Sequence, residues 1–370
     1  MNPSIHPFVN ELTPYRAGRP VEEIQRQYGL TKVIKLASNE NPRPLPESVR
    51  AAIRDELNNL NLYPDSDNFY LRERIAATLG VAPENIIVGA GSVELIRMIV
   101  GTFVCPGQEV LTSEKTFSFY RIATTERLGR DAYVEVPMDE QLRFDLAALE
   151  RAVTDRTKVI FLTNPNNPTG TCWPREAVTK FIQRIPSDKI VVLDNAYQEY
   201  VDTPSDYPDG IAEALARPNV IVLRTFSKIY GLAGLRVGYA IAAPETIAQL
   251  GRMKAPFNVS RVGQRAALAA LADTDYPAES ARLNRIGRQY LFEKLTALGM
   301  RVIPSVTNFL LVYPPVSANR LCDALLCQGV IVRPMESFGI PEAFRVTVGL
   351  PEENDFFLEK LALVLPGLGV

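Results

Sequence analysis

Three polar segments in the middle of the sequence each follow an apolar run, and their side chains could act together on one small molecule. They are the stretch 164–170 (NPNNPTG), Asp194 and Lys228. Open parallel sheets bind ligands at the carboxyl ends of their strands, and neighbouring strands lie about 5 Å apart. Taken alone, 164–170 could be only a turn, Asp194 a helix cap and Lys228 a solvent-exposed lysine. Their joint position favours an amide, a carboxylate and an amine that converge on one small ring.

Hydroxyl and guanidinium groups flank the lysine in the sequence. Thr225 and Ser227 precede it, and Arg236 follows it after glycines that allow a close approach of the backbone. These groups bind phosphate well. Upstream, the stretch 89–92 (GAGS) follows an apolar run and opens a predicted helix over 93–103, which adds backbone N–H groups and a helix dipole. GAGS is a weak signal alone, but the two elements together predict a phosphate site.

The composition excludes several classes of function. The chain has 370 residues, of which 46% are hydrophobic and 22% charged, as expected for a globular protein with a large and a smaller domain. Its formal net charge of −2 provides no basic field for nucleic acid or for an acidic membrane surface. No apolar run approaches the roughly 20 residues of a membrane span, and the first residues do not resemble a signal peptide. We therefore expect a cytoplasmic protein.

Histidine and cysteine are too sparse for several kinds of catalytic site. His6 is the only histidine, which argues against a Ser-His-Asp triad, a Cys-His pair and a multi-histidine zinc site. The four cysteines form no CxxC pair and are expected to be reduced thiols, so no metal site is predicted. Acid–base chemistry must therefore fall to Lys, Asp, Glu, Tyr or a cofactor.

Short apolar runs alternate with amphipathic stretches between about residues 80 and 245, which predicts a mostly parallel sheet in an α/β domain. Several runs are apolar on both faces, as strands covered by helices on both sides must be. The strand candidates are 86–89, 109–112, 132–136, 158–163, 190–194, 220–226 and 237–242.

The character of the chain changes near its two ends. Residues 1–30 are rich in proline and polar residues and are interpreted as an N-terminal arm. We assign 31–260 to the large domain and 261–370 to a smaller α+β domain, with a long linking helix at about 277–298.

Motifs spread over nearly the whole chain resemble those of the fold-type I, pyridoxal-phosphate (PLP) dependent aminotransferases of the class-II group, and most closely the histidinol-phosphate aminotransferase family. The SK…GLAGLR motif is highly specific, whereas NNPTG and Asp-x-Ala-Tyr are shared by related aminotransferases. The motifs are SNENP at 38–42, LYPD at 62–65, NNPTG at 166–170, DNAY at 194–197 and SK…GLAGLR at 227–236. The resemblance implies a seven-stranded, mostly parallel sheet between helices.

The resemblance also implies roles for individual residues. Lys228 is expected to bind the cofactor as a Schiff base and to shuttle a proton, and Asp194 to pair with the pyridine nitrogen. Asn167 and Tyr197 would contact the phenolic oxygen of PLP. The cofactor phosphate would be held by Ser92, Val93, Thr225, Ser227 and Arg236.

Two aromatic residues and the substrate contacts complete the implied site. Phe117 would stack on the cofactor ring, and Tyr63 would reach the cofactor phosphate of a second subunit, which implies a homodimer with shared active sites. The implied substrate contacts are Tyr15, Asn39, Arg333 and Arg345. Two arginines suit a dianionic phosphate, whereas one would serve a carboxylate, and Arg333 could instead form a surface ion pair.

Departures from the family motifs fall at 16–18, at 43–44 (RP), at Val93 and at Asn195. The resemblance implies that the segments around 15–18 and 43–44 shape the substrate pocket. The first hypothesis is transfer of an amino group between histidinol phosphate and 2-oxoglutarate, in a ping-pong reaction that yields imidazole acetol phosphate and glutamate. An aromatic amino-acid aminotransferase is the close alternative. A PLP-dependent amino-acid-phosphate decarboxylase and a non-enzymatic PLP-binding regulator remain further alternatives.

Overall fold

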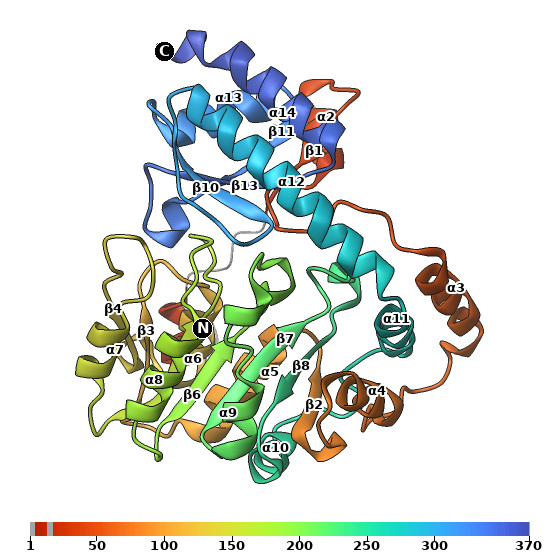
Figure 1. Cartoon of the computed structure of the whole chain (residues 1–370), viewed down its shortest axis with the longest axis vertical. Coiled ribbons are helices and arrows are strands. Elements are labelled where there is room, and N and C mark those ends of the chain that lie inside the picture. Colours follow the sequence, from red (N-terminus) through yellow and green to blue (C-terminus); the bar gives the residue numbers. More distant parts are fainter. Residues whose placement is uncertain (1–3, 13–17, 370) are drawn as a thin grey trace.

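The computed structural model describes residues 4–12 and 18–369, which form a larger and a smaller domain (Figure 1). The larger domain contains a seven-stranded sheet in the order β2-β8-β7-β6-β5-β3-β4, in which only β8 runs antiparallel to its neighbours. The predicted α/β fold is therefore confirmed. The strands are β2 (Ile86–Gly89), β3 (Glu109–Ser113), β4 (Tyr133–Val136), β5 (Thr157–Thr163), β6 (Ile190–Asp194), β7 (Val220–Thr225) and β8 (Gly238–Ile241).

Helices cover both faces of this sheet, which explains why its central strands are apolar throughout. Along β6, Val191 and Leu193 pack into one hydrophobic cluster, while Ile190 and Val192 pack into the other. This alternation follows from the two-residue period of a strand. The first cluster is covered by α3 (Glu47–Glu56), α4 (Phe69–Leu79), α7 (Leu146–Ala152), α8 (Arg175–Arg184), α9 (Ile211–Ala216) and α11 (Arg261–Ala272). The second is covered by α5 (Ser92–Phe103), α6 (Phe119–Leu128) and α10 (Pro244–Gly251).

The smaller domain is built on a four-stranded antiparallel sheet in the order β12-β13-β10-β9. The helix α12 (Asp275–Ala297) runs from the larger domain to the smaller one, close to the predicted 277–298 (Figure 1). The strands are β9 (Arg301–Val302), β10 (Phe309–Tyr313), β12 (Arg333–Pro334) and β13 (Phe344–Thr347). The other helices of this domain are α13 (Ala318–Cys327) and α14 (Pro351–Val364).

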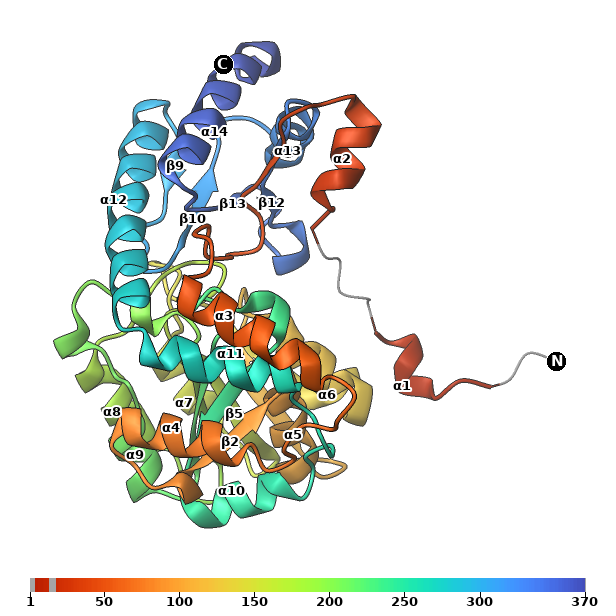
Figure 2. The same cartoon turned by 90° about the vertical axis from the view of Figure 1, so that its right-hand side faces the viewer.

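The observed cores divide the chain differently from the predicted boundaries at 31 and 261. The strand β1 (Ile34–Lys35) pairs in parallel with β11 (Val330–Ile331), so this early segment belongs to the smaller domain. Conversely, α11 packs in the core of the larger domain beside α3 and α4 (Figure 2). A sequence pattern shows that a segment is amphipathic but does not show which core receives its apolar face.

The N-terminal segment lies across both domains. The helix α2 (Val21–Tyr28) buries Ile24 against Ala37 and Ile331 of the smaller domain, whereas α1 (Pro7–Asn10) contacts α6 of the larger one (Figure 2). None of the helices in the described ranges combines the length and the apolar character that a bilayer crossing requires.

Candidate active site

A cavity of about 160 Å³ opens where the carboxyl ends of β5, β6 and β7 face the smaller domain. Most of the residues singled out in the sequence line it, although they come from segments far apart in the chain. They are Asn39, Ser92, Val93, Phe117, Asn167, Asp194, Tyr197, Thr225, Ser227, Lys228, Arg236 and Arg345. The topology of the parallel sheet therefore brings the three polar segments together, as their positions in the sequence predict.

Lys228 lies just beyond the end of β7, between two side chains that anchor it. Phe226 and Ile229 on either side of it are fully buried. The Lys228 Nζ donates hydrogen bonds to the carbonyl oxygens of Ser38 (3.3 Å) and Asn39 (3.2 Å). The amine therefore lies inside the cavity and is not the solvent-exposed lysine of the alternative interpretation.

The Asp194 carboxylate is buried at the end of β6 and is held by a tyrosine that the sequence reasoning missed. The Tyr120 hydroxyl donates to Asp194 Oδ2 at 2.7 Å and also contacts the Thr163 hydroxyl at 2.8 Å. The Tyr120 ring stacks on Phe161, with 4.3 Å between centroids. The stretch 116–120 (TFSFY) contains this residue, but nothing in its spacing distinguishes a ring at the cofactor face from one beneath the carboxylate.

The charge on Asp194 depends on the balance between burial and these contacts. Burial raises the pKa of the Asp194 carboxyl, while the hydrogen bond from Tyr120 and the charge of Lys228 lower it. Burial and the neighbouring carboxylate raise the pKa of Tyr120 well above its usual value, so Tyr120 remains a donor. A buried carboxylate at this position would strongly favour a cationic N–H group as its ligand.

Donors for an anion surround the start of α5. Gly91 has a φ of 77°, a conformation that favours glycine, and the Arg236 guanidinium lies against the space that a Cβ would occupy there. Arg236 Nη1 lies 3.3 Å from Ser227 Oγ, and the Ser227 N–H donates to Thr225 Oγ1 at 3.1 Å. A guanidinium, hydroxyls and a helix N-terminus fit a phosphate group.

The wall opposite Lys228 is fixed by contacts between the domains. Asn39 Nδ2 donates to the Tyr197 hydroxyl at 3.0 Å, and the Asn39 N–H donates to Thr347 Oγ1 at 3.0 Å. The buried Arg345 guanidinium donates to Asn167 Oδ1 and, at 2.9 Å, to the Ala37 carbonyl. Arg345 therefore brings a cation from the smaller domain into the cavity.

Two of the predicted residues that the structure describes do not line this cavity. Arg333 is buried and lies directly opposite Arg345 in the β12–β13 pair, so the two side chains share one face of this sheet, but only Arg345 lines the cavity. Tyr63 is 78% exposed, and its ring stacks on Phe257 with 4.5 Å between centroids. Tyr15 lies outside the described residues. Phe338, which the sequence analysis did not single out, lines the cavity on the side of the smaller domain.

Residues 31–361 match the family described as "Aminotransferase class I and II". The chain therefore belongs to the class I and II aminotransferases, and the strand-end site described above lies within the matched region.

Its individual relatives carry a more specific name. A histidinol-phosphate aminotransferase from Anaeromyxobacter sp. (strain Fw109-5) is 47% identical over 98% of this chain and 99% of its own length. A second, from Moorella thermoacetica, is 43% identical over 98% of this chain and 93% of its own. The crystal structure of histidinol-phosphate aminotransferase from Sinorhizobium meliloti in complex with pyridoxal-5'-phosphate superposes with a TM-score of 0.89 at 32% identity. That superposition covers 99% of this chain and 98% of the other.

Proposed function

We propose that this aminotransferase uses PLP to exchange an amino group between histidinol phosphate and 2-oxoglutarate, as a step of histidine biosynthesis. One observation carries the proposal: a buried carboxylate, a cavity-facing amine and a set of anion donors open into a single cavity. These donors, which we call the phosphate cradle, are Thr225, Ser227, Arg236 and the start of α5. The names of the full-length relatives support the choice of substrate, and the bound ligand of the solved relative supports the choice of cofactor.

The cavity residues divide the work of holding PLP, which when bound supplies a conjugated ring that accepts electrons from the substrate. Asp194 would accept a hydrogen bond from the protonated ring nitrogen. Ser227, Arg236 and the first turn of α5 would hold the phosphate, and Phe117 would cover one face of the ring. The Tyr197 hydroxyl, held by Asn39, would contact the ring oxygen.

Lys228 is the group best placed to move a proton. His6, the only histidine, does not line the cavity, and Asp194 is already bound by Tyr120. The Lys228 Nζ is therefore the amine that would remove the proton from the amino-bearing carbon of one substrate. In the other half-reaction it would deliver a proton to the corresponding carbon of the oxo acid. Both half-reactions would use this one amine, which accounts for alternating binding of the two substrates.

The anionic end of the substrate would bind on the side of the smaller domain. Arg345 lines the cavity, and Arg333 lies beside it in the adjoining strand. Two neighbouring guanidinium groups suit a phosphate dianion, which favours histidinol phosphate. The second candidate is an aromatic amino-acid aminotransferase, favoured by the fact that, of these two arginines, Arg345 alone reaches the lining and could bind an α-carboxylate.

We also propose a cytoplasmic homodimer in which Tyr63 completes the cofactor site of the other subunit. The support is the exposure of an aromatic side chain whose ring is nevertheless held in place by Phe257. Sedimentation of the purified protein tests the dimer. A monomer at micromolar concentration would contradict it without affecting the assignment of the reaction.

Turnover by the purified protein tests the substrate. We expect efficient transamination of histidinol phosphate with 2-oxoglutarate, and borohydride reduction followed by peptide mapping should find the cofactor on Lys228. A strong preference for phenylalanine would overturn the histidinol-phosphate assignment in favour of the second candidate. Release of carbon dioxide without any oxo acid would instead indicate a decarboxylase.

A further inference from the structure

The phosphate-binding turn 89–92 is clamped from outside the cavity by two side chains. Glu94 Oε2 accepts a hydrogen bond from the Ala90 N–H at 2.6 Å. Asn258 Nδ2 donates to the same carboxylate oxygen at 2.8 Å and to the Val88 carbonyl at 3.2 Å. A single amide therefore ties the strand that enters the turn to the helix that leaves it.

The position of Asn258 is set by these two bonds. Because Nδ2 contacts two acceptors, the orientation of the amide is unambiguous. Asn258 Oδ1 is buried and has no hydrogen-bond partner among the described residues. An unsatisfied buried acceptor costs free energy. Asn258 Nδ2 thus makes both hydrogen bonds at the turn although Asn258 Oδ1 is left without a partner.

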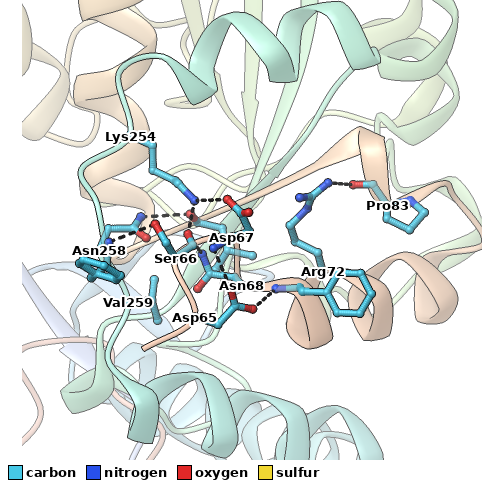
Figure 3. Close-up of polar contacts among 12 residues, drawn as sticks. Asp65, Ser66, Asp67, Asn68, Arg72, Pro83, Lys254, Asn258 and Val259 are labelled. Carbon is cyan, nitrogen blue, oxygen red and sulfur yellow. Dashed lines mark hydrogen bonds and ion pairs between the residues drawn. The ribbon is translucent and has the colours of Figure 1, made fainter. Parts of the chain in front are cut away.

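The segment 254–260, which we call the linker, also holds the loop that carries Tyr63. Lys254 donates to the Ser66 carbonyl and forms an ion pair with Asp67 at 3.9 Å. Figure 3 shows Lys254 reaching from the linker to Ser66 and Asp67, with Asn258 beside it. The linker therefore contacts two separate structures, the phosphate turn on one side and the Tyr63 loop on the other.

Phe257, next to Asn258, contacts the side chain of Tyr63. The two rings stack with 4.5 Å between centroids and 18° between planes. Phe257 has a φ of 56°, which is unfavourable for a bulky side chain. This backbone conformation lets neighbouring residues face different partners: Asn258 contacts the turn and Phe257 contacts Tyr63.

We propose that Asn258 is a positioning residue for the phosphate cradle of its own subunit, and that Phe257 positions Tyr63 for the cradle of the other subunit. The linker thereby joins the two cradles of a dimer. The first half of this inference rests on PLP as the cofactor, and the second half also rests on the proposed homodimer.

Comparison of two ligands tests the role of Asn258 without measuring turnover. Cofactor-free full-length protein is titrated with PLP and with pyridoxal, which lacks the phosphate, and binding is followed by absorbance. In Asn258→Ala we expect the Kd for PLP to rise by about tenfold or more, as for loss of a hydrogen bond to a charged group. The Kd for pyridoxal should stay within about twofold, because pyridoxal does not use the cradle.

The matched control is Asn85→Ala, at the opposite end of the region around β2. Asn85 is buried, and its Nδ2 donates to the Ala242 carbonyl at 2.9 Å, but it lies away from the turn. We expect this variant to change neither Kd, whatever its effect on thermal stability. Glu94→Gln keeps an acceptor for Ala90 and Asn258. Its Kd for PLP should therefore rise less than that of Glu94→Ala. Equal weakening of PLP and pyridoxal in Asn258→Ala, or no weakening of either, would overturn the role of Asn258.

Mixed dimers distinguish the proposed role of Asn258 within its own subunit from that of Phe257 between subunits. A Phe257→Ala subunit is paired with a Lys228→Ala subunit, and the Kd for PLP is read from the absorbance that only a site with Lys228 gives. That site receives its Tyr63 from the Lys228→Ala subunit, whose Phe257 is native, so its affinity should be restored. When an Asn258→Ala subunit is paired with a Lys228→Ala subunit instead, PLP binding at the site with Lys228 should remain weak.

Each outcome of the mixed-dimer experiment has one meaning. Failure of Phe257→Ala to be rescued would overturn the role of Phe257 between subunits. Rescue of Asn258→Ala would overturn its role within its own subunit. If the native protein sediments as a monomer, the homodimer and the second half of the inference fail together, and the comparison of PLP with pyridoxal still decides the first half.

Discussion

The two walls of the cavity are built in different ways. The wall with Asp194, Thr225 and Lys228 comes from the ends of the adjacent strands β6 and β7, which are buried along their whole length. The opposite wall combines Asn39 and Arg345 from segments 306 positions apart in the chain, held by hydrogen bonds between loops and strands of the smaller domain. Hydrogen bonding between strands fixes the first wall, whereas the placement of one domain on the other fixes the second.

Few polar contacts join the two walls directly. Lys228 Nζ contacts the Ser38 and Asn39 carbonyls, and Arg345 contacts Asn167. A ligand in the cavity must compete for these groups. The first wall should therefore set the chemistry, and the second should set the choice of substrate.

Replacing the amine of the first wall should have the largest effect. We expect Lys228→Ala to lower kcat by at least about 10³-fold with every amino donor, because proton transfer is lost along with the covalent link. Single-turnover kinetics measure this loss. Residual PLP binding through the phosphate cradle should persist, and activity within tenfold of the native enzyme would contradict the role of Lys228.

Removing the charge of the first wall should have the next largest effect. We expect Asp194→Asn to lower kcat/KM by about 100-fold with all substrates alike, because the carboxylate proposed to face the ring nitrogen becomes an uncharged amide. A loss confined to one substrate would break the proposed division between the walls.

Although Asp194→Asn should lower activity, it should raise the stability of the cofactor-free protein. Burial raises the pKa of Asp194 in the folded protein, so its ionised form costs stability above that pKa, and the cost disappears as the pH falls through it. Cofactor-free Asp194→Asn should therefore melt at a higher temperature than the native protein at pH 7. The difference should shrink in acid, as measured by thermal unfolding over a pH series.

Changes in the second wall should discriminate between substrates. We expect Arg345→Gln to lower kcat/KM by about 100-fold for anionic substrates while the absorbance of the bound cofactor stays unchanged. Arg333→Gln should raise the KM for histidinol phosphate by about tenfold and leave that for glutamate unaltered. Equal effects of Arg333→Gln on both substrates would favour a purely structural role for this arginine.

The smallest effect should come from the tyrosine beneath the first wall. Tyr120→Phe removes the hydrogen bond that lowers the pKa of Asp194, so that pKa should rise further. The acid limb of the kcat/KM profile should therefore move to higher pH, with a loss of about threefold to tenfold in cofactor affinity. An unchanged profile would show that the Tyr120 hydroxyl does not tune Asp194.

Much of the first wall could be predicted from the sequence because it depends on local patterns. Apolar runs that end in Asp194 and Lys228 specify buried parallel strands, and parallel strands place their carboxyl ends side by side. Tyr120 could not be predicted in the same way. Its hydroxyl reaches Asp194 only because α6 packs on one face of the sheet, and its ring is as apolar as its neighbours in the stretch 116–120.

The N-terminal segment and α11 show the limit of pattern reading. Residues 34–35 pair with β11, and α11 packs against α3, although sequence proximity places each in the other domain. Pairing of a two-residue strand leaves almost no periodic signal, and an amphipathic helix fits any apolar surface of the right width.

The sequence alone predicts the α/β class, the three strand-end groups and the proposed phosphate-binding elements, because alternation, turn residues and glycines act over short distances. Three features depend on tertiary packing: Arg345 lines the cavity while Arg333 does not, Tyr120 holds Asp194, and Asn258 contacts both ends of the turn 89–92. Those contacts join segments from different elements, and their geometry is set by how helices and domains pack, which no local pattern of residues encodes.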